Sequence, residues 1–68
     1  MSDYETAEAE FGPLGFSYRT INALATNAVC TVAALGRLSE PQLLRFIGVG
    51  QKTLREVKPY LWAEGAIA

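Results

Sequence analysis

Helix-breaking residues recur along this chain at intervals too short for any long element. Asn27, Gly36 and the triplet Gly48-Val49-Gly50 separate runs of apolar residues that fall at helical spacing. Asparagine and glycine are the residues that most readily end a helix. No segment alternates apolar and polar residues as a half-buried strand does. We therefore expect an all-α chain with about four short helices joined by short turns.

Three hydroxyl residues mark where these helices begin. Ser17 and Thr31 each precede an apolar-periodic segment, and a hydroxyl oxygen in that position accepts a free backbone N–H of the first turn. Ser39 is followed three residues later by Gln42, which is the spacing of a capping box. Pro41, within that first turn, removes no internal hydrogen bond. Each helix start therefore has a local chemical cause.

The last helix is expected to run from about residue 51 to 64 and to stop at Gly65. Pro59 falls inside it, where proline costs about 3 kcal/mol unless the helix bends or frays. Tyr60 and Trp62 are two residues apart, so both cannot face one core. One of the two aromatic side chains is expected to be exposed or covered by the N-terminal segment.

Charge divides the sequence into two parts. Residues 1–10 hold acidic residues and no basic one, whereas every lysine and arginine comes later. No apolar stripe runs through residues 1–10, and acidic segments of this kind tend to stay solvated. We expect an acidic, flexible leader over residues 1–12 and one helix-hairpin-helix domain over residues 13–68, since 68 residues suffice for one domain.

Composition excludes several classes of function. The sequence has no histidine and one cysteine, Cys30, so imidazole-dependent zinc sites, an internal disulfide and cysteine–histidine catalysis are ruled out. No acid–base pair suggests an active site, and we expect no enzyme activity, metal or cofactor. No apolar run approaches the roughly 20 residues of a membrane span, and the acidic N-terminus does not read as a secretory signal. A cytoplasmic, monomeric protein is expected.

The most specific signal is the stretch Phe46-Ile47-Gly48-Val49-Gly50-Gln51-Lys52-Thr53-Leu54. Its glycines permit a tight bend and close backbone approach, and the helix that follows offers free N–H groups and a positive dipole end. Lys52 adds a charge and Thr53 a hydroxyl, so the stretch reads as a phosphate cradle. The simpler alternative is a tight interhelical turn. A similar turn occurs earlier in the sequence, at Asn27-Ala28-Val29, and the pair suggests tandem hairpins.

Four segments carry a family resemblance: Leu14-Gly15-Phe16-Ser17-Tyr18-Arg19-Thr20-Ile21-Asn22-Ala23-Leu24, Thr31-Val32-Ala33-Ala34-Leu35, Leu38-Ser39-Glu40-Pro41-Gln42-Leu43-Leu44 and Val49-Gly50-Gln51-Lys52-Thr53-Leu54. From Leu14 to Glu64 the sequence resembles the C-terminal domain of the bacterial RNA polymerase alpha subunit. The resemblance implies a compact bundle of four to five helices with tandem helix-hairpin-helix motifs. Because the alpha N-terminal assembly domain has no counterpart here, we expect a free-standing or excised relative.

In that family the domain binds the minor groove of A·T-rich DNA upstream of promoters and docks transcription activators. The implied DNA-binding positions are Arg19, Asn22, Ala23, Gly50, Lys52 and Thr53. Arg19 matches the family's minor-groove arginine, and a guanidinium suits the negative potential of a narrow groove. Gln51 and Ala25 stand where lysine is frequent, which implies weaker binding because each neutralised phosphate adds affinity.

Two functions follow as hypotheses. The first is a DNA-binding module of transcription that makes weak, shape-directed contacts to the minor groove and to phosphates of double-stranded DNA. The alternative is a protein–protein interaction module that kept the fold, lost most DNA affinity and docks RNA polymerase or a transcription regulator. The missing lysines, the acidic leader and the aromatic pair of Tyr60 and Trp62 favour this alternative.

Overall fold

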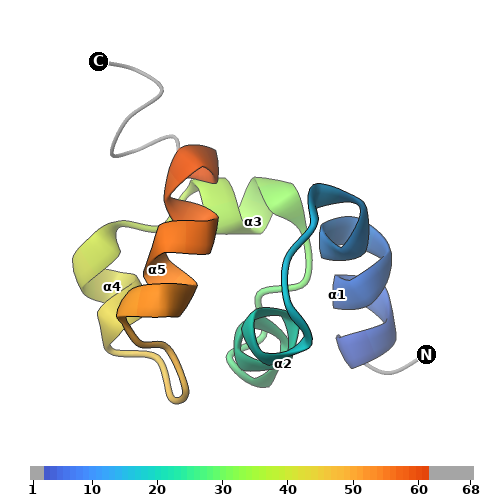
Figure 1. The fold of residues 1–68 in the computed structure, drawn as a ribbon, viewed down its shortest axis with the longest axis horizontal. Coiled ribbons are helices and arrows are strands. Elements are labelled where there is room, and N and C mark those ends of the chain that lie inside the picture. Colours follow the sequence, from blue (N-terminus) through green and yellow to red (C-terminus); the bar gives the residue numbers. More distant parts are fainter. Residues whose placement is uncertain (1–2, 62–68) are drawn as a thin grey trace.

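The computed structural model describes residues 3–61 as short helices joined by turns (Figure 1). The elements are α1 (Asp3–Phe11), η1 (Gly12–Leu14, a 3₁₀ turn), α2 (Tyr18–Thr26), α3 (Val32–Gly36), α4 (Glu40–Leu44), α5 (Gln51–Val57) and η2 (Lys58–Tyr60, a 3₁₀ turn). No strand occurs within this range, which confirms the all-α expectation. None of the helices described is long and apolar enough to cross a membrane.

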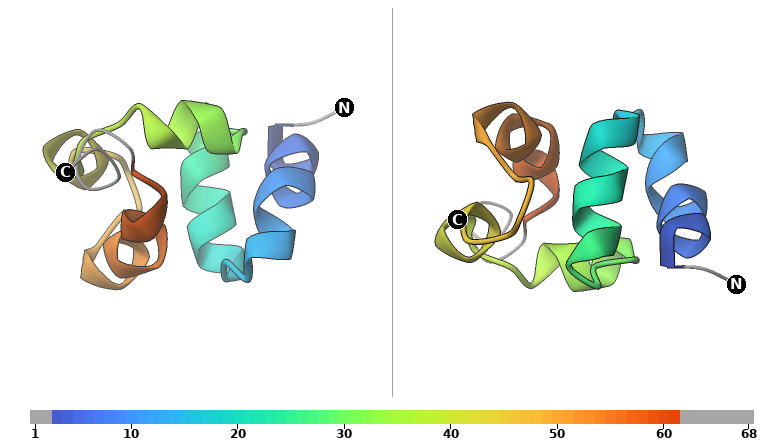
Figure 2. Two further views of the ribbon diagram at one scale, coloured as in Figure 1. Left: turned by 90° about the horizontal axis from the view of Figure 1, so that it is seen from above. Right: turned by 90° about the horizontal axis from the view of Figure 1, so that it is seen from below.

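Helix α2 occupies the middle of the bundle. In Figures 1 and 2, α1 lies along one side of it, the α4–α5 pair lies on the other, and α3 crosses one end. The apolar face of α2 reaches both sides, so a single core runs through the molecule. Its buried members include Ile21, Leu24, Ala25, Leu35, Leu43, Leu54, Val57 and Leu61.

The three predicted caps are confirmed. The side chains of Ser17 and Thr31 each accept the backbone N–H three residues further on, at 3.3 and 3.1 Å. The Ser39 N–H donates to the Gln42 side chain at 2.9 Å, and the Gln42 N–H donates to the Ser39 hydroxyl at 3.4 Å. This reciprocal pair is the capping box that the spacing predicted.

Residues 3–11 differ from the flexible leader expected over residues 1–12. They form α1, in which Ala7 and Phe11 are fully buried and Tyr4 packs against the core. These three side chains share one helical face. They form an apolar stripe that is too narrow to be recognised in the sequence among its acidic neighbours. The Glu10 carboxylate also accepts the Val32 N–H at 3.0 Å, which satisfies a free amide at the start of α3. Packing on α2 and this cap together hold the segment in place.

The C-terminal helix is shorter than predicted. α5 ends at Val57, and the backbone passes through η2 to an extended, buried Leu61. Pro59 explains the early end, because proline offers no N–H and its ring clashes with the preceding helical turn. The Tyr60 ring meets Phe16 edge-on, with centroids 5.4 Å apart. The predicted stop at Gly65 and the expectations for Trp62 lie outside the described residues.

The two predicted hairpin turns both involve α2: Asn27-Ala28-Val29 follows its last turn, and the bend between α4 and α5, called the second bend below, packs against it. α2 ends before Asn27 as expected, but the residue with positive φ is Ala28, at 63°. The Asn27 side chain instead donates to the Ala23 carbonyl at 2.8 Å and to the Ile47 carbonyl at 3.1 Å. It therefore ties the end of α2 to the bend between α4 and α5. Gly48 lies in that second bend with φ of 85°.

Candidate nucleic-acid interface

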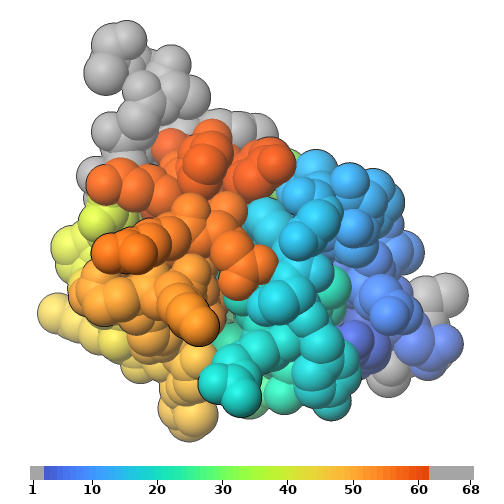
Figure 3. Space-filling view, in the orientation of Figure 1, coloured from blue at the N-terminus to red at the C-terminus, as the bar shows by residue number. Residues whose placement is uncertain are grey.

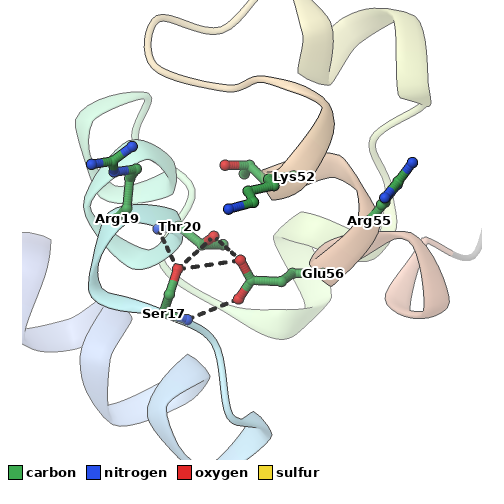
Figure 4. Close-up of a pocket in the computed structure, with 7 residues that line it drawn as sticks. Ser17, Arg19, Thr20, Lys52, Arg55 and Glu56 are labelled. Carbon is green, nitrogen blue, oxygen red and sulfur yellow. Dashed lines mark hydrogen bonds between the residues drawn. The ribbon is translucent and has the colours of Figure 1, made fainter.

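An open pocket lies between the start of α2 and the exposed face of α5 (Figure 4). It is lined by Ser17, Arg19, Thr20, Lys52, Thr53, Arg55 and Glu56. Arg19 comes from the first hairpin and Lys52 from the second, and they flank the same opening. Arg55 lies at the opposite end of the pocket from Arg19. Cationic side chains therefore border a cleft that is open to solvent.

Glu56 joins the two walls of this pocket. Its carboxylate accepts the Ser17 N–H at 2.8 Å and the Thr20 hydroxyl at 2.6 Å, and the Ser17 hydroxyl lies 3.2 Å away. A carboxylate from α5 thus completes the cap of α2, which a helix normally obtains from its own first turn. Arg19 lies between Ser17 and Thr20 in the sequence, and Lys52 lies one helical turn before Glu56. The hydrogen bonds between Glu56 and the start of α2 therefore fix the spacing of Arg19 and Lys52.

The hydrogen bonds also set the charge state of Glu56. Burial alone would raise its pKa, but the bonds from Thr20 and Ser17 outweigh burial and lower the pKa below its usual value. The carboxylate is therefore ionised at neutral pH and directed at α2. Glu56 lies one helical turn after Lys52 but forms no ion pair with it; within residues 3–61 an ion pair instead joins Lys58 to Glu40 at 3.4 Å. Among the described residues no carboxylate pairs with the Lys52 ammonium, which lines the pocket.

The second bend is exposed and its two glycines serve different purposes. Gly48 has positive φ, and a Cβ there would lie 3.6 Å from that of Ala23, an ordinary contact. Gly50 precedes α5 in an extended conformation that any residue adopts, with φ −120° and ψ −167°. A Cβ at Gly50 would meet nothing within 4 Å. Conformational freedom is therefore needed at Gly48, whereas Gly50 leaves open space beside the backbone.

The structure brings together part of the predicted contact set. Arg19, Lys52 and Thr53 line the pocket, although Thr53 is only 5% exposed. Asn22 is exposed on α2 but does not line the pocket. Ala23 is 6% exposed and lies against the second bend, so it is not presented to solvent.

Four lining residues escaped the sequence-based prediction of the site: Ser17, Thr20, Arg55 and Glu56. Arg55 and Glu56 lie three and four residues after Lys52, which places all three on one face of α5. That spacing was a usable signal. Thr20 is fully buried among apolar residues of α2, and a buried hydroxyl requires a partner. Its partner could not be identified from the sequence.

The side chains that line the pocket are suited to binding an anion. Within residues 3–61 no three His, Cys, Asp or Glu side chains gather as a metal site. The Cys30 thiol is partly buried, and burial raises its pKa, so it is a poor nucleophile at neutral pH. The pocket instead offers cations and hydroxyl groups, which are the donors that phosphate oxygens accept.

Comparison with known proteins identifies the family. The family model for the C-terminal domain of the bacterial RNA polymerase alpha chain matches residues 4–62, which takes in nearly all of the described helices. No curated protein and no solved structure matches the sequence. Members of this family are non-catalytic, DNA-binding domains of transcription. The protein belongs to the family of C-terminal domains of the bacterial RNA polymerase alpha subunit.

Proposed function

We propose that this domain binds A·T-rich double-stranded DNA weakly, through the minor groove and its flanking phosphates, as a module of the transcription machinery. The observation that carries the proposal is the shared pocket of Arg19 and Lys52, which a single duplex could contact at once. Arg19 would enter the minor groove, where a narrow A-tract concentrates negative potential. Lys52 would pair with a phosphate at the groove's edge.

The other predicted DNA-binding residues each have a different role in this proposal. Asn22 is exposed one turn after Arg19 and would reach a sugar or a base edge. Thr53 would donate its hydroxyl to a phosphate that enters the pocket. Gly50 would allow the phosphate to approach the backbone, since nothing occupies the space where a side chain would be. Ala23 would act indirectly, because its small side chain lets the second bend close on α2.

Binding is expected to be weak for an electrostatic reason. Gln51 carries no charge and Ala25 is buried, so neither supplies a phosphate contact. The pocket presents three cations, Arg19, Lys52 and Arg55. Three phosphate contacts correspond to a slope of about −2 to −3 for log K against log salt. Such a slope permits binding at low salt and little at high salt.

A titration of an A·T-rich duplex at low salt tests the proposal. We expect Arg19→Ala to weaken binding about tenfold, in line with loss of one well-placed groove contact. Arg37→Ala is the matched control, because Arg37 is an exposed arginine that follows α3 and does not line the pocket. Equal binding by wild type and Arg19→Ala would remove the minor-groove role.

The second candidate is a protein-interaction module that docks RNA polymerase or a transcription regulator. The acidic surface of α1 favours it, because Asp3, Glu5 and Glu8 are exposed and oppose a polyanion. Binding to purified RNA polymerase that survives Arg19→Ala and Lys52→Ala would select this function. Loss of that binding in both variants would instead show that polymerase contacts the pocket residues, and would remove the argument for a separate interaction surface on α1.

A further inference from the structure

Ile47 is the most exposed large hydrophobic side chain among the described residues. It is 78% exposed, against 69% for Tyr18 and 45% for Leu44. It lies at the bend between α4 and α5, directly before Gly48. An isoleucine in this position contributes little to the core of its own domain. It is available to a binding partner.

The backbone that carries Ile47 is fixed on both sides. Its carbonyl accepts the Asn27 side chain at 3.1 Å, and the Val49 N–H donates to the Phe46 carbonyl at 3.3 Å. The left-handed turn at Gly48 rests against α2. The Ile47 backbone therefore has a defined position relative to α2, and a partner meets a prepared contact that costs little ordering.

The charged residues near Ile47 in the sequence indicate the chemistry of that partner. Arg45 is exposed just before the bend, and Lys52 is exposed just after it. The acidic side chains of this hairpin are engaged elsewhere, since Glu40 pairs with Lys58 and Glu56 bonds to α2. In sequence, Ile47 thus stands between two exposed cations, a pattern that suits a polyanion with apolar surface between its charges. The two deoxyribose walls of a DNA minor groove, lined outside by phosphates, have this character.

Arg19 and Ile47 are held by the same helix. Asn27, the residue that caps the end of α2 and donates to the Ile47 carbonyl, lies eight residues after Arg19, which corresponds to about 12 Å along the helix axis. Figure 3 shows the bend between α4 and α5 next to α2 on one face of the molecule, in agreement with the approach of Gly48 to Ala23. A groove that receives Arg19 can therefore also run past Ile47.

We infer that Ile47 is a specificity-determining contact that packs against the deoxyribose walls of the minor groove. This inference rests on the proposed function and extends it. In a narrow A·T groove the two sugar walls approach each other, so a branched aliphatic side chain touches both. A wider G·C groove, with the guanine amino group on its floor, loses part of this contact. Ile47 thus favours A·T tracts through shape and without a hydrogen bond.

The test uses residues 1–68 with matched A·T-rich and G·C-rich duplexes, measured by fluorescence anisotropy over a series of salt concentrations. We expect Ile47→Ala to weaken A·T binding about 3- to 10-fold and to reduce the preference over G·C. Its salt slope should equal that of wild type, because an apolar contact releases no counterions. Lys52→Ala should instead make the slope shallower by about 1.

Leu44→Ala is the matched control, because it truncates a second exposed aliphatic side chain that lies on α4 and not in the bend. It should bind both duplexes as wild type does. Unchanged A·T binding or unchanged A·T preference in Ile47→Ala would overturn the inference, and so would an equal effect of Leu44→Ala. If Ile47→Ala met one of these outcomes while Arg19→Ala still weakened binding, the inference about Ile47 would fail and the proposed function would stand. If Arg19→Ala bound as wild type, the proposed function itself would fail.

Discussion

The Thr20 hydroxyl donates a 2.6 Å hydrogen bond to the Glu56 carboxylate and thereby joins α2 to α5 at the candidate interface. Thr20 is fully buried, so its hydroxyl has lost contact with water. We expect Glu56→Ala to lower the free energy of unfolding by about 1–3 kcal/mol, because it removes a charged acceptor and leaves the buried Thr20 hydroxyl without it. Urea unfolding followed by circular dichroism measures the change.

The same variant should also weaken DNA binding, since the spacing of Arg19 and Lys52 depends on this contact. Glu8→Ala, which removes an exposed glutamate on α1, serves as the control for stability. A Glu56→Ala protein as stable as wild type would show that the contact does not hold the two helices together.

Glu56 also makes stability depend on pH in a defined direction. Its pKa in the folded protein lies below the unfolded value because the hydrogen bonds from Thr20 and Ser17 outweigh burial. The resulting stabilisation is present above the ordinary pKa of a glutamate side chain and is lost as pH falls through the lower folded pKa. Thermal unfolding from pH 7 to pH 3 should show wild type losing its advantage over Glu56→Gln in acid. A difference that stays constant over this range would contradict the assignment.

The two glycines of the second bend should separate folding from binding. Gly48→Ala places a side chain at φ of 85° and should cost about 1–2 kcal/mol of stability. Gly50→Ala meets open space in an extended conformation, so it should fold as wild type does. Its methyl group would fill the space proposed for a phosphate, and DNA binding should weaken several-fold. Thermal unfolding and duplex titration of both variants test the pair, and the reverse pattern would refute it.

Helix α1 should prove necessary for stability. Phe11 is fully buried and stacks on Phe16 at 5.4 Å, so Phe11→Ala should cost about 3–5 kcal/mol. That is a large share of the stability of so small a domain, and much of the population should unfold at room temperature. Ile47→Ala, a large-to-small change at an exposed residue, should leave the melting temperature unchanged. A stable Phe11→Ala protein would support the flexible leader first expected for residues 1–12.

Features with a local cause were predictable from the sequence. The caps at Ser17, Thr31 and Ser39 need only a hydroxyl and the first turn of the same helix. The second bend followed from its glycines, and the all-α class from the spacing of apolar residues. These signals depend on neighbours within a few residues, so they survive without knowledge of the fold.

Features that depend on distant partners were not predictable. α1 is stable because Phe11 finds Phe16, and the Asn27 side chain takes the Ile47 carbonyl twenty residues later. Glu56 reaches Ser17, 39 residues earlier in the sequence, instead of Lys52 one turn away. In each case an interaction between elements overrides what local spacing favours. The cationic residues of the pocket were partly found, but the carboxylate that sets their spacing was not.

Backbone amide shift mapping with an A·T-rich duplex at low salt tests the central claim most directly, because it asks whether one face of the domain receives the DNA. We predict that the largest shifts fall on residues 17–23 and 47–56, which belong to the start of α2, the second bend and α5. Residues 3–10 of α1 should change little. Shifts concentrated on α1, or confined to one hairpin with Arg19 unaffected, would contradict a single DNA-binding face formed by Arg19 and Lys52.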